Sequence, residues 1–275
     1  MTIRVPDTLT ADNSEKYEGS IRLWPGGLSF SGYMPLTKNS FFTENVLFDS
    51  DSAKVQSLKS TFFDNQCFSY SYRALYVIYA SEKYTLAPEN VFSEEDKSLL
   101  FSFCHQKDEI GKILVQPLSS LQSMLLYDVD SDAYEFLSRS LSNPRFIHSL
   151  SPLLLSWQKK SLTSYPKQVH VFIHGETLDI ACFERGEMLF VNSFDYSNEN
   201  DIVYFINYTC KQLDVNQLED RVFFCGNEAK CLSSMSVVKK YIRQVDYLPP
   251  QMSNYTDATD MNISLDVVTL MECAL

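Results

Sequence analysis

One order of predicted elements, strand-strand-strand-helix-strand, occurs twice in this chain of 275 residues. In its first occurrence the strands cover residues 20–23, 28–33, 40–48 and 73–80, and the helix covers 53–64. In its second occurrence the strands cover residues 169–173, 177–183, 188–194 and 222–225, and the helix covers 198–213. Apolar residues at helical spacing indicate the helices, and short apolar runs between turn residues indicate the strands. The repeat has no matching residues, so it predicts two α/β lobes of similar architecture.

Glycines stand at three turns of these units. Trp24-Pro25-Gly26-Gly27 separates the first two strands of the first unit, and His174-Gly175-Glu176 separates those of the second. Gly226-Asn227 follows the last strand of the second unit. Glycine allows the positive φ that a tight hairpin needs, so both hairpins are predicted to be short.

The two units resemble the actin-like ATPase superfamily, whose two lobes each carry a ribonuclease-H-like core around a nucleotide cleft. Residues 171–183, VFIHGETLDIACF, are similar to the second phosphate hairpin of that superfamily, and residues 222–229, VFFCGNEA, resemble its adenosine loop. More closely, the whole chain resembles an uncharacterised bacterial domain-of-unknown-function family with this fold, whose opening is similar to residues 20–23 and 27–31. Actin-like pilus-assembly and cell-division proteins are more distant matches.

This resemblance implies an α/β, actin-like ATPase fold with two ribonuclease-H-like lobes, residues 1–165 and 166–275. The segment at about 82–165 is an insertion in the first lobe, and the last ~25 residues are candidates for packing back on that lobe. Within the insertion we predict helices over 93–105, 130–141 and 152–162, and strands over 113–116 and 124–127. Residues 247–259 read as a loop, and 263–271 as either a helix or a strand.

The chain departs from the superfamily at the residues that hold phosphate and metal. Alignment on Asp179 puts Phe172 where the resemblance implies a metal-positioning aspartate, and puts His174 and Glu176 on glycine positions. Side chains there would keep phosphate from the backbone N–H groups, and a glutamate would repel it. No aspartate precedes the first hairpin, at Pro25. The remaining cleft candidates are Gly26, Gly27, Gly175, Thr177 and Gly226.

We therefore expect a non-catalytic scaffold or adaptor with a degenerate nucleotide cleft, no catalytic residue, and no cofactor or metal. A protein partner is expected rather than nucleic acid, because a net charge of −12 disfavours phosphate-backbone binding. One alternative is a divergent nucleotide-binding switch or ATPase. A second is a haloacid-dehalogenase-like phosphatase using Asp49 and Asp51, although capping of the following helix is the simpler role for these residues.

A second acidic run, from Asp128 to Glu135, resembles a calcium loop only in part. Ala133 stands where that loop needs glycine, and Arg139 where it needs a bidentate glutamate. Capping of the helix over 130–141 is the better interpretation.

The histidines and cysteines do not form a metal-binding pattern in the sequence. His170 and His174 would share one face of a strand about 13 Å apart, too far for one ion. The seven cysteines contain no C-x-x-C pair, which favours buried free thiols in a reduced, cytoplasmic protein. The longest strongly apolar stretch, residues 74–80, is too short to span a membrane.

Overall fold

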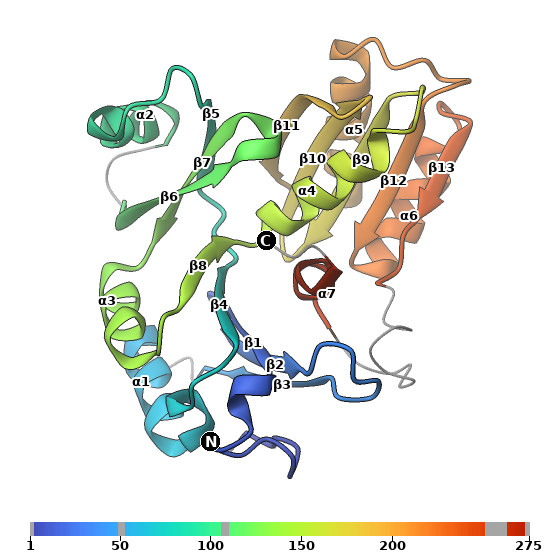
Figure 1. Ribbon diagram of the computed structural model, residues 1–275. Coiled ribbons are helices and arrows are strands. Elements are labelled where there is room, and N and C mark those ends of the chain that lie inside the picture. The colour runs from blue at the N-terminus through green and yellow to red at the C-terminus, as the bar shows by residue number, and fades with distance from the viewer. Residues whose placement is uncertain (1–2, 49–52, 106–109, 251–262, 273–275) are drawn as a thin grey trace. The chain divides into compact units, whose positions relative to one another are not determined.

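The structure is a computed structural model that describes residues 3–48, 53–105, 110–250 and 263–272. The chain forms two compact units (Figure 1). The first contains the described residues up to Ser151 together with Ile263, and the second contains the described residues from Pro152 to Pro250 and the C-terminal helix. Each unit contains one five-stranded sheet, and the first also contains a three-stranded sheet.

The first unit contains the first predicted run of elements. Its strands and helix are β1 (Glu18–Trp24), β2 (Gly27–Tyr33), β3 (Phe42–Leu47), α1 (Lys54–Asp64) and β4 (Ala74–Tyr79), followed much later by β8 (Arg145–His148). The sheet order is β3-β2-β1-β4-β8. The first three strands are antiparallel, whereas β4 runs parallel to both β1 and β8. The predicted order of elements is therefore confirmed, and β8 is an addition that the sequence analysis missed.

The inserted segment builds a second, smaller sheet in the first unit. Its elements are β5 (Tyr84–Pro88), α2 (Lys97–Cys104), β6 (Lys112–Leu118), β7 (Ser123–Val129) and α3 (Ser131–Ser140). The strands pair antiparallel in the order β5-β7-β6. Both predicted strands are present as β6 and β7, and β5 was not predicted. Single 3₁₀ turns occur at Ser14–Lys16, Gln66–Ser69, Glu94–Asp96 and Ser119–Leu121.

The second unit contains the second run of elements. Its elements are α4 (Leu150–Ser161, the first two residues of which belong to the first unit), β9 (Gln168–His174), β10 (Thr177–Glu184), β11 (Glu187–Asp195), α5 (Glu199–Gln212), β12 (Arg221–Gly226), α6 (Glu228–Val238), β13 (Gln244–Tyr247) and α7 (Leu265–Glu272). The sheet order is β11-β10-β9-β12-β13. This run is confirmed as well. The prediction of a loop over 247–259 is wrong at residue 247, because Tyr247 is the last residue of β13. The segment 263–271, predicted as either a helix or a strand, contains the helix α7.

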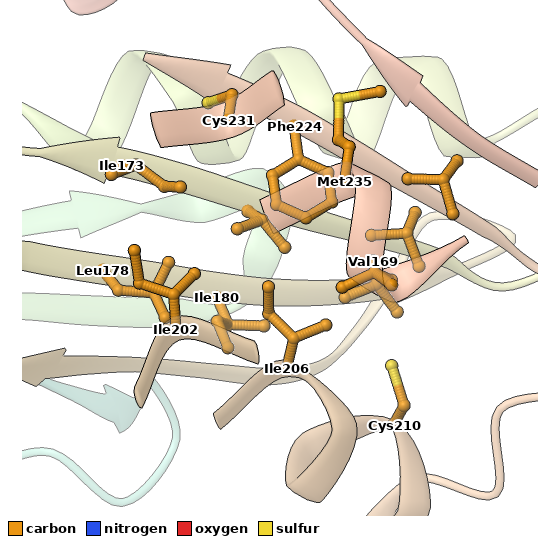
Figure 2. Packing of buried hydrophobic residues seen from close by; sticks show 14 of the residues in the cluster. Val169, Ile173, Leu178, Ile180, Ile202, Ile206, Cys210, Phe224, Cys231 and Met235 are labelled. Carbon is orange, nitrogen blue, oxygen red and sulfur yellow. The ribbon is translucent and has the colours of Figure 1, made fainter. Parts of the chain in front are cut away.

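One face of the second sheet forms a continuous hydrophobic core with α5 and α6 (Figure 2). Strand residues of alternate positions point into it because successive side chains of a strand face opposite sides. They include Val169, Val171, Ile173, Leu178 and Ile180, all fully buried. Helical positions one turn apart, such as Ile202 and Ile206 of α5, meet them from the other side. Burial of each such side chain contributes about 1.5–3 kcal/mol.

The opposite face of this sheet contacts α4. The indole of Trp157 on α4 stacks on the imidazole of His170 on β9, with ring centroids 4.8 Å apart. Both faces of β9 and β10 are thus covered, which explains why nearly every residue of these strands is buried, instead of buried and exposed residues alternating. No helix among the described residues is long and apolar enough to cross a membrane.

Candidate functional site

The turn between β9 and β10 is the second predicted phosphate hairpin. His174 and Thr177 face each other as the last pair of the ladder, so the turn consists of Gly175 and Glu176. Gly175 has φ +54°, in the left-handed region that favours glycine. Both turn residues are exposed, whereas Thr177 is buried. Of the predicted candidates, Gly175 lies at the tip of the hairpin and Thr177 lies in the sheet below it.

Two side chains from elsewhere in the second unit bond the tip of this hairpin. Lys230 Nζ donates to the carbonyl oxygen of Gly175 at 3.1 Å, and the Tyr196 hydroxyl donates to the same oxygen at 2.8 Å. Lys230 Nζ also lies 2.7 Å from the Tyr196 oxygen and 4.8 Å from the centre of its ring. The backbone N–H of Tyr196 donates to the Glu176 carbonyl at 3.1 Å. The tip is therefore held by a lysine and a tyrosine that the sequence analysis did not single out.

A buried carboxylate lies on β10, two residues after Thr177. Asp179, on β10, is 4% exposed and accepts hydrogen bonds from His174 Nε2 at 2.7 Å and from the Ser193 hydroxyl of β11. His174 in turn stacks on Phe172, with ring centroids 4.6 Å apart. Phe172 is 3% exposed, so the position where the resemblance implies a metal-positioning aspartate is an apolar, buried ring. His174 is the last residue of β9, with a defined partner, rather than a free turn residue.

Gly226, at the end of β12, lies against the same hairpin. It pairs with Ile173, and a Cβ at Gly226 would be 2.1 Å from the Ile173 carbonyl oxygen. Its φ of +102° is a second reason for glycine at this position. The next residue, Asn227, begins α6 by accepting the backbone N–H of Lys230 at 3.1 Å. Close backbone packing and helix capping thus account for this glycine and asparagine, and they place Lys230 within reach of Gly175.

The other two glycine candidates belong to the first unit. Pro25 and Gly26 form the turn between β1 and β2, and Gly27 is the first residue of β2. The Gly26 carbonyl accepts the N–H of Phe48 at 2.9 Å. A Cβ at Gly27 would lie 2.3 Å from the carbonyl oxygen of Val46 on β3. The guanidinium of Arg22 lies 5.7 Å from the ring centre of Trp24 in the same hairpin. The need for close strand approach accounts for Gly27.

The structure also shows the role of one of the two acidic runs that were considered as alternative sites. The Asp130 side chain caps α3 by accepting the N–H of Ala133 at 2.8 Å, which confirms the capping interpretation of the second acidic run. Asp49 and Asp51 lie outside the described residues, and the N-cap residue of α1 is Ala53, without a side-chain cap. Within the described ranges, no group of three or more His, Cys, Asp or Glu is placed to hold a metal ion.

The described cysteines are free and all but one are buried. Cys67, Cys182, Cys210, Cys225 and Cys231 are buried, and Cys104 is exposed. Burial raises the pKa of Cys182 and of Cys210 to about 12. These thiols are therefore protonated at neutral pH and act as small apolar side chains. Cys273 lies outside the described residues.

A family model described as "protein of unknown function (DUF3822)" matches residues 6–245. The chain belongs to this family. A solved structure from Bacteroides thetaiotaomicron VPI-5482, described as a protein with actin-like ATPase fold and unknown function, is 30% identical to this chain in sequence. The similarity covers 96% of this chain and 99% of the Bacteroides chain, with a TM-score of 0.83. The predicted resemblance and the predicted actin-like fold of this DUF3822 chain are both confirmed.

A more distant similarity is to the structure of a PilM–PilN type IV pilus biogenesis complex. The two chains are 10% identical, with a TM-score of 0.55 over 94% of this chain and 98% of that one. At this level of identity the similarity shows that the DUF3822 chain shares its fold with that protein. No curated protein matches the chain.

Proposed function

We propose that this DUF3822 protein is a non-catalytic actin-like scaffold or adaptor, whose nucleotide site has degenerated and whose ligand is another protein. The observation that carries the proposal is the tip of the β9–β10 hairpin. In place of a run of glycines it presents the side chain of Glu176, and its Gly175 carbonyl is bonded by Lys230 and Tyr196. A carboxylate at that tip repels phosphate, and the side chains keep it from the backbone N–H groups.

Two further features support the loss of ATP turnover. The buried ring of Phe172 cannot orient a metal ion, and the first hairpin has no aspartate ahead of Pro25. Phosphoryl transfer depends on metal ions that neutralise the charge developing on the phosphates. Without carboxylates in these two places, neither hairpin would hold Mg²⁺ beside a triphosphate.

The proposal that the ligand is another protein depends on the fold and on the net charge of the chain. The distantly similar PilM structure is a complex with PilN, so this fold forms a protein complex in at least one case. Because fold alone does not fix function, the PilM–PilN complex supports an adaptor role by analogy. A net charge of −12 favours a partner with basic or neutral contact surfaces over nucleic acid.

One observation favours the second candidate function, a divergent nucleotide-binding switch. Lys230 Nζ lies 3.1 Å from the Gly175 carbonyl, so a positive charge is present beside the turn. A lysine in that position would partly offset the charge of Glu176 and could turn from the carbonyl to a phosphate oxygen. The two functions differ in whether nucleotide binds at all.

The deciding experiment is calorimetric titration of Mg·ATP and Mg·ADP into the purified protein and its Glu176→Gly variant. The degenerate site predicts no binding of either nucleotide to the wild-type protein at millimolar concentration, and no hydrolysis. Micromolar binding by the wild-type protein, strengthened in Glu176→Gly and lost in Lys230→Met, would establish the switch instead. Glu187→Gly, which removes an exposed glutamate beside the other hairpin of this sheet, is the control for the change in charge.

A further inference from the structure

The edge strand β11 of the second sheet is long and accessible. Among the described residues its one neighbouring strand is β10 (Figure 1). None of its nine residues is buried, whereas seven of the eight residues of β10 are. At the opposite edge β13 has four residues, and two prolines follow it after Leu248. Short edge strands and prolines protect a sheet from pairing with another chain, and β11 has neither protection.

A bulge divides this edge into two parts. Leu189 has no partner on β10, because the register shifts between Cys182 and Phe183. The residues from Phe190 to Asp195 pair with β10 without interruption. In an antiparallel ladder, alternate residues direct their backbone N–H and C=O groups away from the neighbouring strand. The regular part of β11, after the bulge, can therefore pair with a further strand on its outer side.

A row of aromatic rings leads from this edge onto the surface of α5. Phe190 and Phe194 of β11 pack against the core on the sheet face that α5 covers. Phe205 of α5 stacks on Phe194, with ring centroids 4.5 Å apart. Tyr204 packs edge-on against Phe205 at 5.4 Å, and Tyr208 stacks on Tyr204 at 6.0 Å. Tyr204 is 61% exposed and Tyr208 49%, so these two rings offer contact surface beside the edge strand.

Acidic side chains stand at both ends of β11. Glu187 is its first residue and Asp195 its last, and both are exposed. Glu187 lies directly opposite Glu184 in the ladder with β10. Among the described residues, none of these three carboxylates has an ion-pair partner. Like charges opposite each other destabilise a strand pair, so a cation beside Glu184 and Glu187 would stabilise the edge.

The basic residues of the same elements do not cancel this charge. Residues 184–212 contain five acidic and two basic side chains, the latter being Arg185 and Lys211. The guanidinium of Arg185 lies 4.9 Å from the ring centre of Tyr165, and Lys211 is in the last turn of α5. One of the acidic residues, Glu199, bonds the Ser233 hydroxyl of α6 and is directed away from the edge. The edge and its surroundings therefore remain negative.

This charge pattern disfavours a second copy of the chain as the partner of β11. Antiparallel pairing of two β11 strands over their whole length would put Glu187 of each opposite Asp195 of the other. Parallel pairing would put each acidic residue opposite its own counterpart. Both arrangements oppose like charges at the two ends of the strand. A strand with a basic residue at each end fits the same edge without repulsion.

We propose that the edge of β11 binds an extended segment of a partner protein, with apolar residues at its centre and lysine or arginine at both ends. This inference rests on the proposed adaptor role, and it specifies the chemistry of the partner and where it binds. Main-chain hydrogen bonds add the segment to the second sheet as a sixth strand. Its apolar side chains lie beside Phe190 and Phe194, and its basic ends lie against Glu187 and Asp195. A basic side chain that extends over α5 stacks on the exposed tyrosines.

The probe is the peptide Lys-Lys-Val-Thr-Val-Thr-Val-Lys-Lys, acetylated and amidated, titrated into the full-length protein by calorimetry. Two lysines at each end place one on either face of the strand in either direction. One comparison peptide has glutamate in place of every lysine. The other has the basic sequence with every valine and threonine N-methylated, which removes the backbone donors that strand pairing needs. We expect a dissociation constant of about 10–1000 μM for the basic peptide and at least tenfold weaker binding of both others.

Two double variants locate the binding by charge. Glu187→Lys with Asp195→Lys reverses the charge at both ends of β11. It should weaken the basic peptide at least tenfold and make the acidic peptide the tighter ligand. Glu219→Lys with Asp246→Lys makes the same change in net charge at exposed positions outside β11 and α5. This control should keep the affinity for the basic peptide within about threefold.

A third double variant tests the two tyrosines. Tyr204→Gln with Tyr208→Gln keeps good helix formers on α5 and should weaken the basic peptide about threefold, through loss of stacking. Its preference for the basic over the acidic peptide should remain. Unchanged affinity would overturn the placement of basic side chains on these rings.

Four results would overturn the proposal. They are no binding of the basic peptide at millimolar concentration, equal binding of the basic and acidic peptides, equal binding of the N-methylated peptide, and an unchanged preference after charge reversal at Glu187 and Asp195. If the protein binds neither the peptide nor nucleotide, this inference fails and the adaptor role stands with a partner at another surface. If it binds nucleotide, the degenerate site fails, and the peptide titrations still decide whether β11 binds a strand.

Discussion

The imidazole of His170 lies nearly parallel to the indole of Trp157, at 11° and with 4.8 Å between ring centroids. Phe223 also stacks on it at 5.2 Å, and neither ring nitrogen has a hydrogen-bond partner among the described residues. A charged imidazole in this apolar stack would lose its hydration without compensation. Burial, aided by the charge of Lys160, therefore lowers the pKa of His170 to about 3.

This histidine should make the protein less stable in mild acid. In the unfolded chain its pKa is near 6.5, so between about pH 6.5 and pH 3 the unfolded state binds a proton that the folded state does not. The free energy of unfolding should fall as the pH decreases through that window, by about 1.4 kcal/mol per unit. From pH 7 to pH 5 the loss from this residue is about 2 kcal/mol, measurable by urea denaturation.

The control for this prediction is His170→Phe, which keeps an aromatic ring in the stack and has no group to titrate. Its free energy of unfolding should be about 2 kcal/mol less sensitive to the change from pH 7 to pH 5 than that of the wild-type protein. Parallel pH profiles for the two proteins would mean that His170 is protonated in the folded state.

Gly226 and Gly175 both have positive φ, and they should respond differently to alanine. A Cβ at Gly226 would lie 2.1 Å from a backbone oxygen, that of Ile173, whereas a Cβ at Gly175 would meet no atom within 4 Å. We expect Gly226→Ala to destabilise the protein by about 3 kcal/mol or more, since strand β12 must move away from β9. Gly175→Ala should cost only about 1 kcal/mol, for the left-handed backbone. Equal melting temperatures of the two variants would contradict the close approach.

The order of elements was predictable because the strands that were predicted for the two five-stranded sheets are segments rich in apolar residues and bounded by turn residues. The two strands of these sheets that were missed are short and lie next to prolines. β8 has four residues and directly follows Asn143-Pro144, and β13 has four residues ahead of Pro249-Pro250. Each of them is an edge strand of its sheet, added in parallel to a central strand. Their pairing depends on contacts distant in sequence, for which local periodicity gives no signal.

The candidate site was predictable only in part, for a similar reason. Glycine at 175 and 226 is visible in the sequence, and so is glutamate at 176. That Lys230 reaches the Gly175 carbonyl, 55 residues away, follows from the pairing of β12 with β9 and from where Asn227 starts α6. The sequence therefore shows where glycine allows a tight turn, whereas the pairing of strands distant in sequence determines which side chains contact that turn.

The buried thiols should be unreactive in the folded protein. Burial raises the pKa of Cys67 to about 11 and that of Cys231 to about 12, so their thiolate fraction at pH 8 is very small. With the exposed Cys104 and with Cys273 both changed to serine, we expect no fast reaction with a thiol-specific disulfide reagent until denaturant is added. A rapidly modified thiol in that variant would show that the segment that carries it opens readily. Restoring Cys104 alone should restore one fast reaction.

Lys230 should stabilise the tip of the β9–β10 hairpin. Its ammonium group bonds the Gly175 carbonyl and the Tyr196 oxygen, and it lies against the Tyr196 ring. Lys230→Met keeps the length of the side chain and removes both hydrogen bonds, so we expect a loss of about 1–2 kcal/mol and faster amide hydrogen exchange at the turn. Lys239→Met, at an exposed position just after the same helix, should change neither quantity. If both lysine variants behave alike, the hairpin is held by its own backbone and by Tyr196, and Lys230 would be available to bind an anion.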